Sequence, residues 1–140
     1  MQLDTALDFV REHTQGVVTT LRRDGRPQLS NISYWAGDDS VIRISVTDGR
    51  AKTNNLRRDP RASLHVTSAD FWTYCVLDCD VELMSTSADP NDATVDALVE
   101  YYRSLSGEHP DWDEYRRAMV TDRRLLLLLT PTHAYGMLSR

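Results

Sequence analysis

The stretch GVVTTLRRDGRPQLSNISYWAGDDSVIRISVTDG, residues 16–49, has the pattern of an antiparallel β-meander. Valine, isoleucine, threonine and aromatic residues, which favour strands, fill its apolar runs. Asp24-Gly25 is a strong signal for a hairpin turn, and the GDDS run at 37–40 is a second turn. The strands that these turns separate are expected at residues 17–20, 29–35 and 41–46.

The segments on either side of this meander add helices and further strands. Residues 3–10 place their apolar side chains on one face of a short helix. A second short helix begins near residue 49 and must end near Asp59, because Pro60 disfavours helical geometry in the residue before it. Further strands are expected at 61–67, 71–85 and 125–129, the last buried on both faces, helices at 93–101 and 111–121, and a short final strand or tail at 132–140. This order predicts a mainly β barrel or sandwich with inserted helices, in a single domain of residues 1–140.

The composition is that of an ordinary globular chain, with 140 residues of which 41% are hydrophobic and 26% charged. The net charge of -5 and the pI near 5.3 argue against a nucleic-acid partner, which would require a basic face. No run approaches the ~20 apolar residues that cross a bilayer. The N-terminus lacks the basic start and apolar core of an export signal. We therefore expect a cytoplasmic protein with no membrane partner.

Cys75 and Cys79 lie in one predicted strand. At ~3.3 Å per residue their α-carbons are ~13 Å apart, which is too far for a disulfide. A zinc site would need two further ligands at short spacing. We expect two buried thiols and no metal site.

Lys52 is the only lysine of the chain, and it follows Arg50 by two residues where a strand is expected to turn into a helix. The helix dipole disfavours cations in the first turn by ~0.3–1 kcal/mol each. A bound phosphate would reverse the sign of this effect, because helix N-termini attract anions and lysine suits phosphate as a mobile point charge. The alternative is a solvated charged face, with Arg57 and Arg58 favourably placed at the helix C-terminus.

Three motifs carry a family resemblance: GRPQLSNISYW at 25–35, GRAKTNNLRRDPRASLHV at 49–66 and MVTDRRLLLLLTPTHAYG at 119–136. Together with the meander, they resemble the split β-barrel flavin and deazaflavin oxidoreductases of the pyridoxamine 5'-phosphate oxidase-like superfamily. The middle motif is similar to the actinobacterial branch that uses coenzyme F420. The resemblance implies a six-stranded antiparallel split β-barrel of the FMN-binding type, a homodimer, and a cofactor groove at the subunit interface.

The same resemblance implies which residues bind the cofactor. The expected contacts to its phosphate or ribityl chain are Arg50, Ala51, Lys52 and Asn55. The expected contacts to its ring are Ser45 and Val46, through backbone groups, and Gln28, Ser30 and Asn31 from the second strand. Trp72 and Tyr74 are expected to flank the ring from the other subunit.

His133 and Tyr135 lie where oxidases of this superfamily place substrate-binding residues. No residue is assigned a catalytic role, since the proton donor is either water or a side chain such as Tyr135. Structural roles stay open for several of these positions: solvent-contacting strand residues for Ser30 and Asn31, core or interface aromatics for Trp72 and Tyr74, and packing at the barrel end for His133 and Tyr135.

The resemblance therefore implies a coenzyme F420-dependent reductase, which transfers hydride from reduced deazaflavin to a conjugated small-molecule acceptor. The alternatives are an FMN-binding oxidoreductase of the same fold, or a non-catalytic flavin- or haem-binding module. Vitamin B6 oxidation is disfavoured, because the THAYGMLSR end lacks the arginine- and histidine-bearing segment that holds the substrate phosphate. A nicotinamide fingerprint is also absent, since RRDGRP contains one glycine and not G-x-G-x-x-G.

Overall fold

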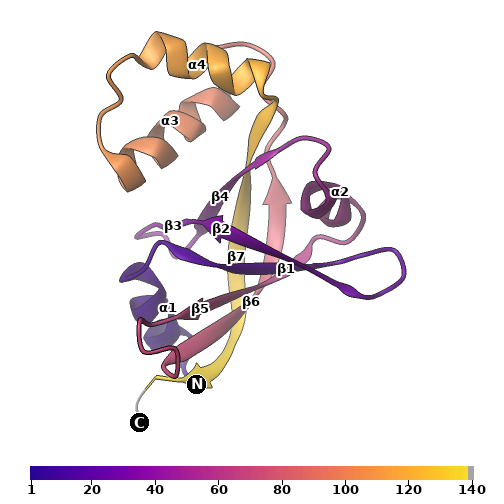
Figure 1. The fold of residues 1–140 in the computed structure, drawn as a ribbon, viewed down its shortest axis with the longest axis vertical. Coiled ribbons are helices and arrows are strands. Elements are labelled where there is room, and N and C mark those ends of the chain that lie inside the picture. The colour runs from indigo at the N-terminus through magenta and orange to yellow at the C-terminus, as the bar shows by residue number, and fades with distance from the viewer. Residues whose placement is uncertain (139–140) are drawn as a thin grey trace.

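The structure is a computed structural model that describes residues 1–138. The elements follow in the order α1 (Leu3–Arg11), β1 (Gln15–Leu21), β2 (Pro27–Ser33), β3 (Trp35–Ala36), β4 (Ile42–Thr47), α2 (Ala51–Arg58), β5 (Arg61–Thr67), β6 (Tyr74–Leu83), α3 (Ala93–Ser106), α4 (Trp112–Thr121) and β7 (Arg124–Met137). The strands form one curled sheet, and α3 and α4 stand together at one end of it (Figure 1). The expected mainly β fold with inserted helices is confirmed.

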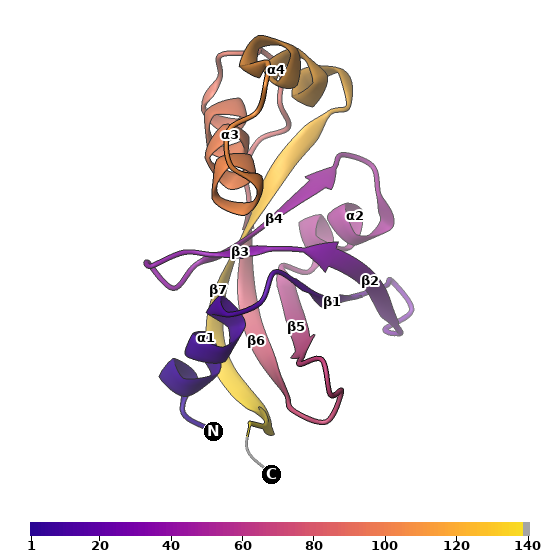
Figure 2. The ribbon, with the colours of Figure 1, turned by 60° about the vertical axis from the view of Figure 1, so that its left-hand side comes forward.

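The sheet has the order β2-β1-β5-β6-β7-β4-β3, and all paired neighbours are antiparallel. Only Tyr34 separates β2 from β3, so one bent segment forms both edges of the sheet (Figure 2). Counted as one strand, this segment gives the six strands of the expected split barrel. Since β3 pairs only with Ile42 and Arg43, the described residues contain no ladder between β2 and the rest of β4. The barrel is split at that point.

Tyr34 fixes the bend between β2 and β3. Its side chain is fully buried, and its hydroxyl donates a hydrogen bond of 2.7 Å to the carbonyl of Val10 in α1. Its backbone N–H donates to the carbonyl of Thr14, at 2.8 Å. Burial raises the pKa of Tyr34, so the phenol stays a donor. These bonds hold α1 against the barrel where the edge segment turns.

The last strand is longer than the sequence predicts. The run 125–129 was expected as one strand and 132–140 as a separate strand or tail, but β7 is continuous through Met137; residues 139–140 lie outside the described residues. A register shift against β6 makes this possible, because Cys79 lies opposite Pro131 and Asp78 opposite His133. Such a bulge accommodates a proline that cannot donate to the ladder. The predicted burial of the leucines on both faces is confirmed for Leu125, Leu126, Leu127 and Leu129.

The strand expected at 71–85 is shorter at both ends, since β6 begins at Tyr74 and ends at Leu83. Trp72 therefore lies in a turn and not in a strand. The Asp70 carboxylate accepts hydrogen bonds from the backbone N–H groups of Trp72 and Thr73, both at 3.1 Å, and Phe71 has a positive φ of 76°. An aspartate that bonds the backbone beyond it favours a turn over a strand.

The two inserted helices begin where their sequence signals place them. Asp92 and Asp111 are the N-caps of α3 and α4, and their carboxylates accept from the N–H groups of Val95 and Glu114. Cys75 and Cys79 are buried, as expected. Among residues 1–138, no helix has the length and apolar character required to span a membrane.

Candidate functional site

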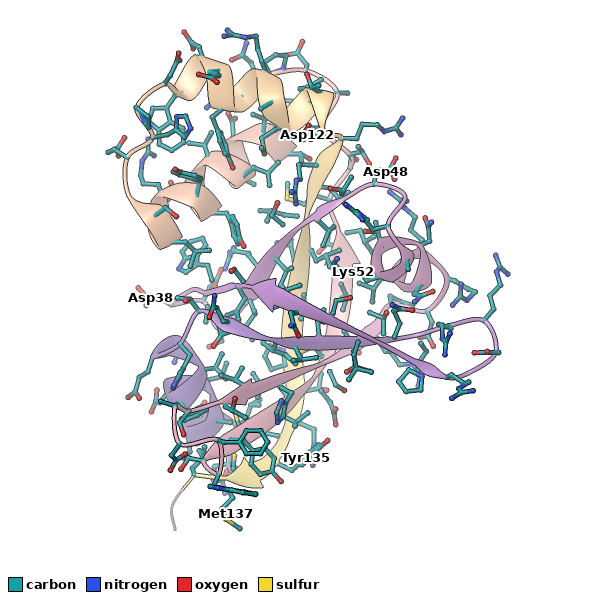
Figure 3. All side chains as sticks on the ribbon, in the orientation of Figure 1. Asp38, Asp48, Lys52, Asp122, Tyr135 and Met137 are labelled. Carbon is teal, nitrogen blue, oxygen red and sulfur yellow. The ribbon has the colours of Figure 1, made fainter. Side chains whose placement is uncertain are left out.

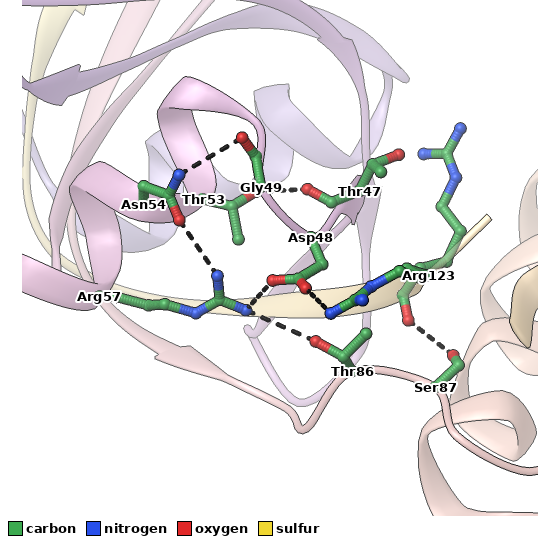
Figure 4. Close-up of polar contacts among 10 residues, drawn as sticks. Thr47, Asp48, Gly49, Thr53, Asn54, Arg57, Thr86, Ser87 and Arg123 are labelled. Carbon is green, nitrogen blue, oxygen red and sulfur yellow. Dashed lines mark hydrogen bonds and ion pairs between the residues drawn. The ribbon is translucent and has the colours of Figure 1, made fainter.

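The N-terminus of α2 carries two cations, as the sequence predicts. Arg50 is the extended N-cap residue, and Lys52 lies in the first turn, which contains no acidic residue. Thr53 donates to the Thr47 carbonyl at 2.9 Å, and Asn54 donates to the Gly49 carbonyl at 3.3 Å (Figure 4). These bonds fix the turn that joins β4 to α2, so the two cations have a defined place at the end of β4.

Asp48 is the carboxylate nearest in sequence to these cations, and it is already paired. It binds Arg57 at 2.5 Å and also binds Arg123, as Figure 4 shows. Arg57, and then Arg123, hold the pKa of Asp48 below its ordinary value. Asp48 therefore remains ionised and neutralises arginines other than Arg50.

Lys52 is half-buried, and among residues 1–138 its ammonium forms no ion pair or hydrogen bond. Burial lowers its pKa, and the nearby charges of Arg50 and Arg124 lower it further. The side chains of Arg50 and Arg124 also form no ion pair within that range. Three cations thus lie close together without a described acidic partner, which is the electrostatic state that an anionic ligand would relieve.

Lys52 opens onto a groove at the split of the barrel, which we call the tyrosine groove (Figure 3 labels Lys52). Its volume is about 420 Å³. The residues that line it come from β2, β4, α2, α3, α4 and β7: Asn31, Ile32, Ser33, Ser45, Lys52, Tyr101, Tyr102, Tyr115, Met119 and Arg124. The groove thus brings together Lys52, Ser45 and Asn31 of the predicted cofactor site.

Sequence reasoning missed the residues that α3, α4 and β7 contribute to this groove. The sequence pattern assigned no ligand contact to Tyr101, Tyr115 or Arg124. Arg124 reaches the site because it pairs with Thr47 in the register between β7 and β4. The concentration of tyrosines in two helices inserted into a barrel was the available signal, since such residues are common in ligand grooves.

A second groove lies along α2 and contains three other predicted residues. We call it the arginine groove; its volume is about 630 Å³. It is lined by Arg22, Arg23, Gln28, Ala51, Asn54, Asn55, Arg57 and Arg58. Asn55 is buried, donates to the Thr20 hydroxyl at 3.1 Å and accepts from Arg58 at 3.2 Å. Its amide therefore attaches α2 to β1, and Gln28, Ala51 and Asn55 do not share a groove with Lys52.

The three predicted residues of β2 do not share one face of the strand. Gln28 and Ser30 are half-buried, whereas Asn31 is exposed, because successive side chains of a strand point to opposite faces. Val46 directs its side chain into the core, where it is 1% exposed. Its side chain therefore does not reach a ligand, and the contact expected through its backbone stays a prediction.

Tyr135 lies toward the end of the barrel opposite α3 and α4 (Figure 3). The other predicted residues are Trp72, just before β6, Tyr74 at the start of β6, and His133 opposite Asp78. Trp72 and Tyr135 are 59% and 49% exposed. His133 is also exposed, and its Nδ1 lies 3.2 Å from the Asp78 carboxylate. Trp72, Tyr74, His133 and Tyr135 line neither groove, so within one chain they do not meet Lys52.

An antiparallel barrel that is open between two strands, with a cation-lined groove at the opening, defines a split β-barrel protein. The chain matches the family described as pyridoxamine 5'-phosphate oxidase over residues 3–137, and it belongs to that family. The predicted superfamily is thereby confirmed.

Solved structures of the same fold have diverse properties. A conserved hypothetical protein from Mycobacterium tuberculosis is 22% identical, with a TM-score of 0.72 over 96% of this chain and 82% of the other. A structure described as an F420 reductase is 24% identical, with a TM-score of 0.63 over 91% and 94%. A haem storage protein from Vibrio cholerae is 12% identical, with a TM-score of 0.68 over 97% and 95%. At these identities the likeness extends to the fold alone.

Proposed function

We propose that the protein is a coenzyme F420-dependent reductase that uses the tyrosine groove as its cofactor site. The observation that carries the proposal is the set of three cations, Arg50, Lys52 and Arg124, which have no acidic partner among residues 1–138 and adjoin this groove. A phosphate-bearing ring compound fits this arrangement, because its anion would offset the mutual repulsion of the cations. The F420 reductase of the same fold supports the choice of cofactor.

When bound, reduced deazaflavin would supply the hydride for a conjugated small-molecule acceptor. The contribution of this chain is position and electrostatics. Lys52, Arg50 and Arg124 would hold the phosphate, and the backbone of Ser45 and Val46 would lie along the ring. Tyr101 and Tyr115 form the wall on the side of α3 and α4. No side chain is given the role of proton donor.

FMN and haem are the competing ligands. FMN carries a phosphate that the same cations would hold, and the family includes flavin enzymes by resemblance. Haem is favoured by the shared fold of the haem storage protein. The phenol groups that would ligate its iron are engaged, however, because Tyr101 donates to the Ser33 carbonyl at 3.1 Å and Tyr115 donates to the Leu98 carbonyl at 2.9 Å. We therefore rank deazaflavin first, FMN second and haem third.

Titration with F420, FMN and haemin tests this ranking. Fluorescence of F420 and FMN, and absorbance of haemin, report binding to the purified protein. We expect F420 to bind most tightly. Lys52→Ala and Arg124→Ala should weaken its affinity roughly 10- to 100-fold each, since hydrogen bonds to charged groups contribute ~1.5–3 kcal/mol. Arg50→Ala should act in the same direction.

Arg117→Ala is the matched control. It removes one positive charge from α4, but Arg117 is exposed and lies two residues from Tyr115, on another face of the helix. Its affinity should stay within about twofold of the wild type. The proposal would be contradicted if the three cation variants bound F420 as tightly as Arg117→Ala does. It would also be contradicted if the wild type bound haemin more tightly than F420 and FMN. Oxidation of reduced F420 by quinones, enones, nitro compounds or tetrapyrroles would then identify the acceptor class.

The proposal includes a homodimer with the cofactor groove at the subunit interface. Its support is the position of Trp72 and Tyr74, which were expected to flank the ring but do not line the tyrosine groove of their own chain. A second copy would bring them to it.

A further inference from the structure

The split of the barrel leaves one edge of β4 without a neighbouring strand beyond Arg43. Ser45 lies opposite Leu126 of β7, and the Leu126 carbonyl accepts from the N–H of Met84 at 3.0 Å, on the far side of β7. In an antiparallel strand pair, two residues that lie opposite each other either both direct their backbone N–H and C=O toward the other strand or both direct them away from it. The N–H and C=O of Ser45 therefore point away from β7 and into the opening between β4 and β2.

Tyr101 fills this opening from α3. Its hydroxyl donates to the Ser33 carbonyl at the end of β2, at 3.1 Å. The backbone N–H of Ser45 points into the same opening, toward the oxygen of the Tyr101 hydroxyl. Burial raises the pKa of Tyr101, while the Ser45 N–H and the charge of Arg124 oppose that rise. The hydroxyl thus donates to β2 and faces the N–H of β4, at the place where the two strands do not pair.

The pair formed by the Ser33 carbonyl and the Ser45 N–H is complementary to a particular kind of ligand edge. A lactam or imide offers an N–H donor beside a C=O acceptor, and the pyrimidine-type ring of a flavin or deazaflavin carries such an edge. Unpaired backbone groups in a half-buried site favour ligands that satisfy both at once. The Tyr101 hydroxyl lies at these two groups while no ligand is there, and it donates to the Ser33 carbonyl.

We propose that the Ser33 carbonyl and the Ser45 N–H form the subsite for a lactam or imide edge of the bound ring, and that Tyr101 occupies this subsite in the free protein. This inference rests on the proposed function, because it takes the tyrosine groove as the cofactor site. Tyr101 is then a specificity-determining residue: a ring that has both groups displaces its hydroxyl, and a ring that lacks them does not.

Displacement involves the Tyr101 side chain and not the whole helical pair. Tyr115 donates to the Leu98 carbonyl and thereby attaches α4 to α3. Tyr102 packs against Tyr115 and His109, with ring centroids 5.1 and 5.2 Å apart. These contacts keep α3 and α4 together while one phenol moves.

Tyr101→Phe tests the inference by removing the competing hydroxyl while the ring remains. Affinity for F420 and for FMN should rise roughly three- to tenfold, since one neutral hydrogen bond is no longer broken on binding. Riboflavin, which has the ring without the phosphate, should show the same gain. Riboflavin methylated at the imide nitrogen should show none, because it cannot donate to Ser33. The control is Ser104→Ala, which removes an exposed hydroxyl from the same helix outside the groove; its affinities should stay within about twofold of the wild type.

The outcomes separate this inference from the proposed function. If Lys52→Ala leaves affinity unchanged but Tyr101→Phe still binds riboflavin more tightly, the phosphate site fails and the ring-edge subsite stands. If Tyr101→Phe binds flavins only as tightly as the wild type, or more weakly, the subsite inference is overturned. This holds whatever the affinity of Lys52→Ala is. If neither the wild type nor any variant, Tyr101→Phe included, binds F420, FMN or riboflavin, both the proposed function and the subsite inference are overturned. Unfolding midpoints of each variant verify that the fold is retained.

Discussion

At the scale of single residues, Asp48 determines which cations remain available for a ligand. It lies between β4 and α2, close in sequence to Arg50, yet its carboxylate is bound by Arg57 and Arg123. Its side chain is 16% exposed, so both arginines lie over a largely covered carboxylate. This pairing attaches the C-terminal half of α2 to the start of β7 and leaves the N-terminal half of α2 positively charged.

Asp48→Asn should therefore destabilise the fold in a pH-dependent way. The pKa of Asp48 lies below its ordinary value of 3.8 because Arg57 and then Arg123 bind its charged form. A carboxyl with a depressed folded pKa stabilises the fold above its unfolded pKa, and this stabilisation is lost as the pH falls through the folded pKa. We expect a lower thermal midpoint than the wild type at pH 7, and a smaller difference below about pH 4.

The control for this measurement is Asp38→Asn, which changes an exposed carboxylate that forms no ion pair among residues 1–138. The thermal midpoint of this variant should equal that of the wild type at each pH in the same range. A difference between Asp48→Asn and the wild type that stays constant down to pH 2 would contradict the ionic origin of the effect.

The position of Lys52 was predictable from the sequence, whereas that of Arg124 was not. A helix start after the third strand places Arg50 and Lys52 together by local geometry. Arg124 joins them only through the pairing of Thr47 with Arg124, and Tyr101 only through the packing of an inserted helix. No local pattern specifies which distant residues meet, because that depends on the register and closure of the whole sheet.

At the scale of elements, α2 is held on the barrel by Asn55. The sequence assigned this residue to the cofactor, but its side chain is 7% exposed and bonds Thr20 of β1. Asn55→Ala should lower the free energy of unfolding by ~1–3 kcal/mol, because it leaves the buried Thr20 hydroxyl without its donor. Affinity for F420 should change less than in Lys52→Ala. Denaturant unfolding and F420 titration measure the two effects.

Asn54→Ala is the matched control on the same helix. Asn54 is exposed, and it bonds the Gly49 carbonyl and Arg57 at the surface. Its loss should reduce stability by less than about 1 kcal/mol. If Asn55→Ala is as stable as Asn54→Ala but binds F420 much more weakly than the wild type, Asn55 belongs to the cofactor site after all.

The elements themselves were largely predictable, and the exceptions have local causes. The meander, the short helix before Pro60 and the caps at Asp92 and Asp111 depend on neighbouring residues. The continuation of β7 past Pro131 depends on a register shift in β6, and the turn at Trp72 depends on how Asp70 bonds the backbone. Propensity alone favoured strand for Trp72, and the side-chain contact overrode it.

At the scale of the whole molecule, the two ends of the barrel carry different surfaces. The end near α3 and α4 carries the tyrosine groove. The other end exposes large apolar side chains: Phe71 at 63%, Trp72 at 59%, Met137 at 51% and Tyr135 at 49%. Phe71 and Trp72 pack edge to face, with centroids 5.1 Å apart. Contiguous exposed apolar side chains of this kind mark interaction sites, and the proposed occupant is a second copy.

Trp72→Ser tests whether that second copy completes the cofactor site. In the proposed homodimer, Trp72 flanks the ring bound to the partner, so its loss should weaken both self-association and F420 affinity. Lys52→Ala should weaken F420 affinity much more than association, because Lys52 lines the groove and contributes none of the exposed apolar surface. Sedimentation velocity at micromolar concentration, with and without F420, distinguishes the two variants. A monomeric wild type that binds F420 at full affinity would show that one chain forms the whole site, and it would remove Trp72 and Tyr74 from it.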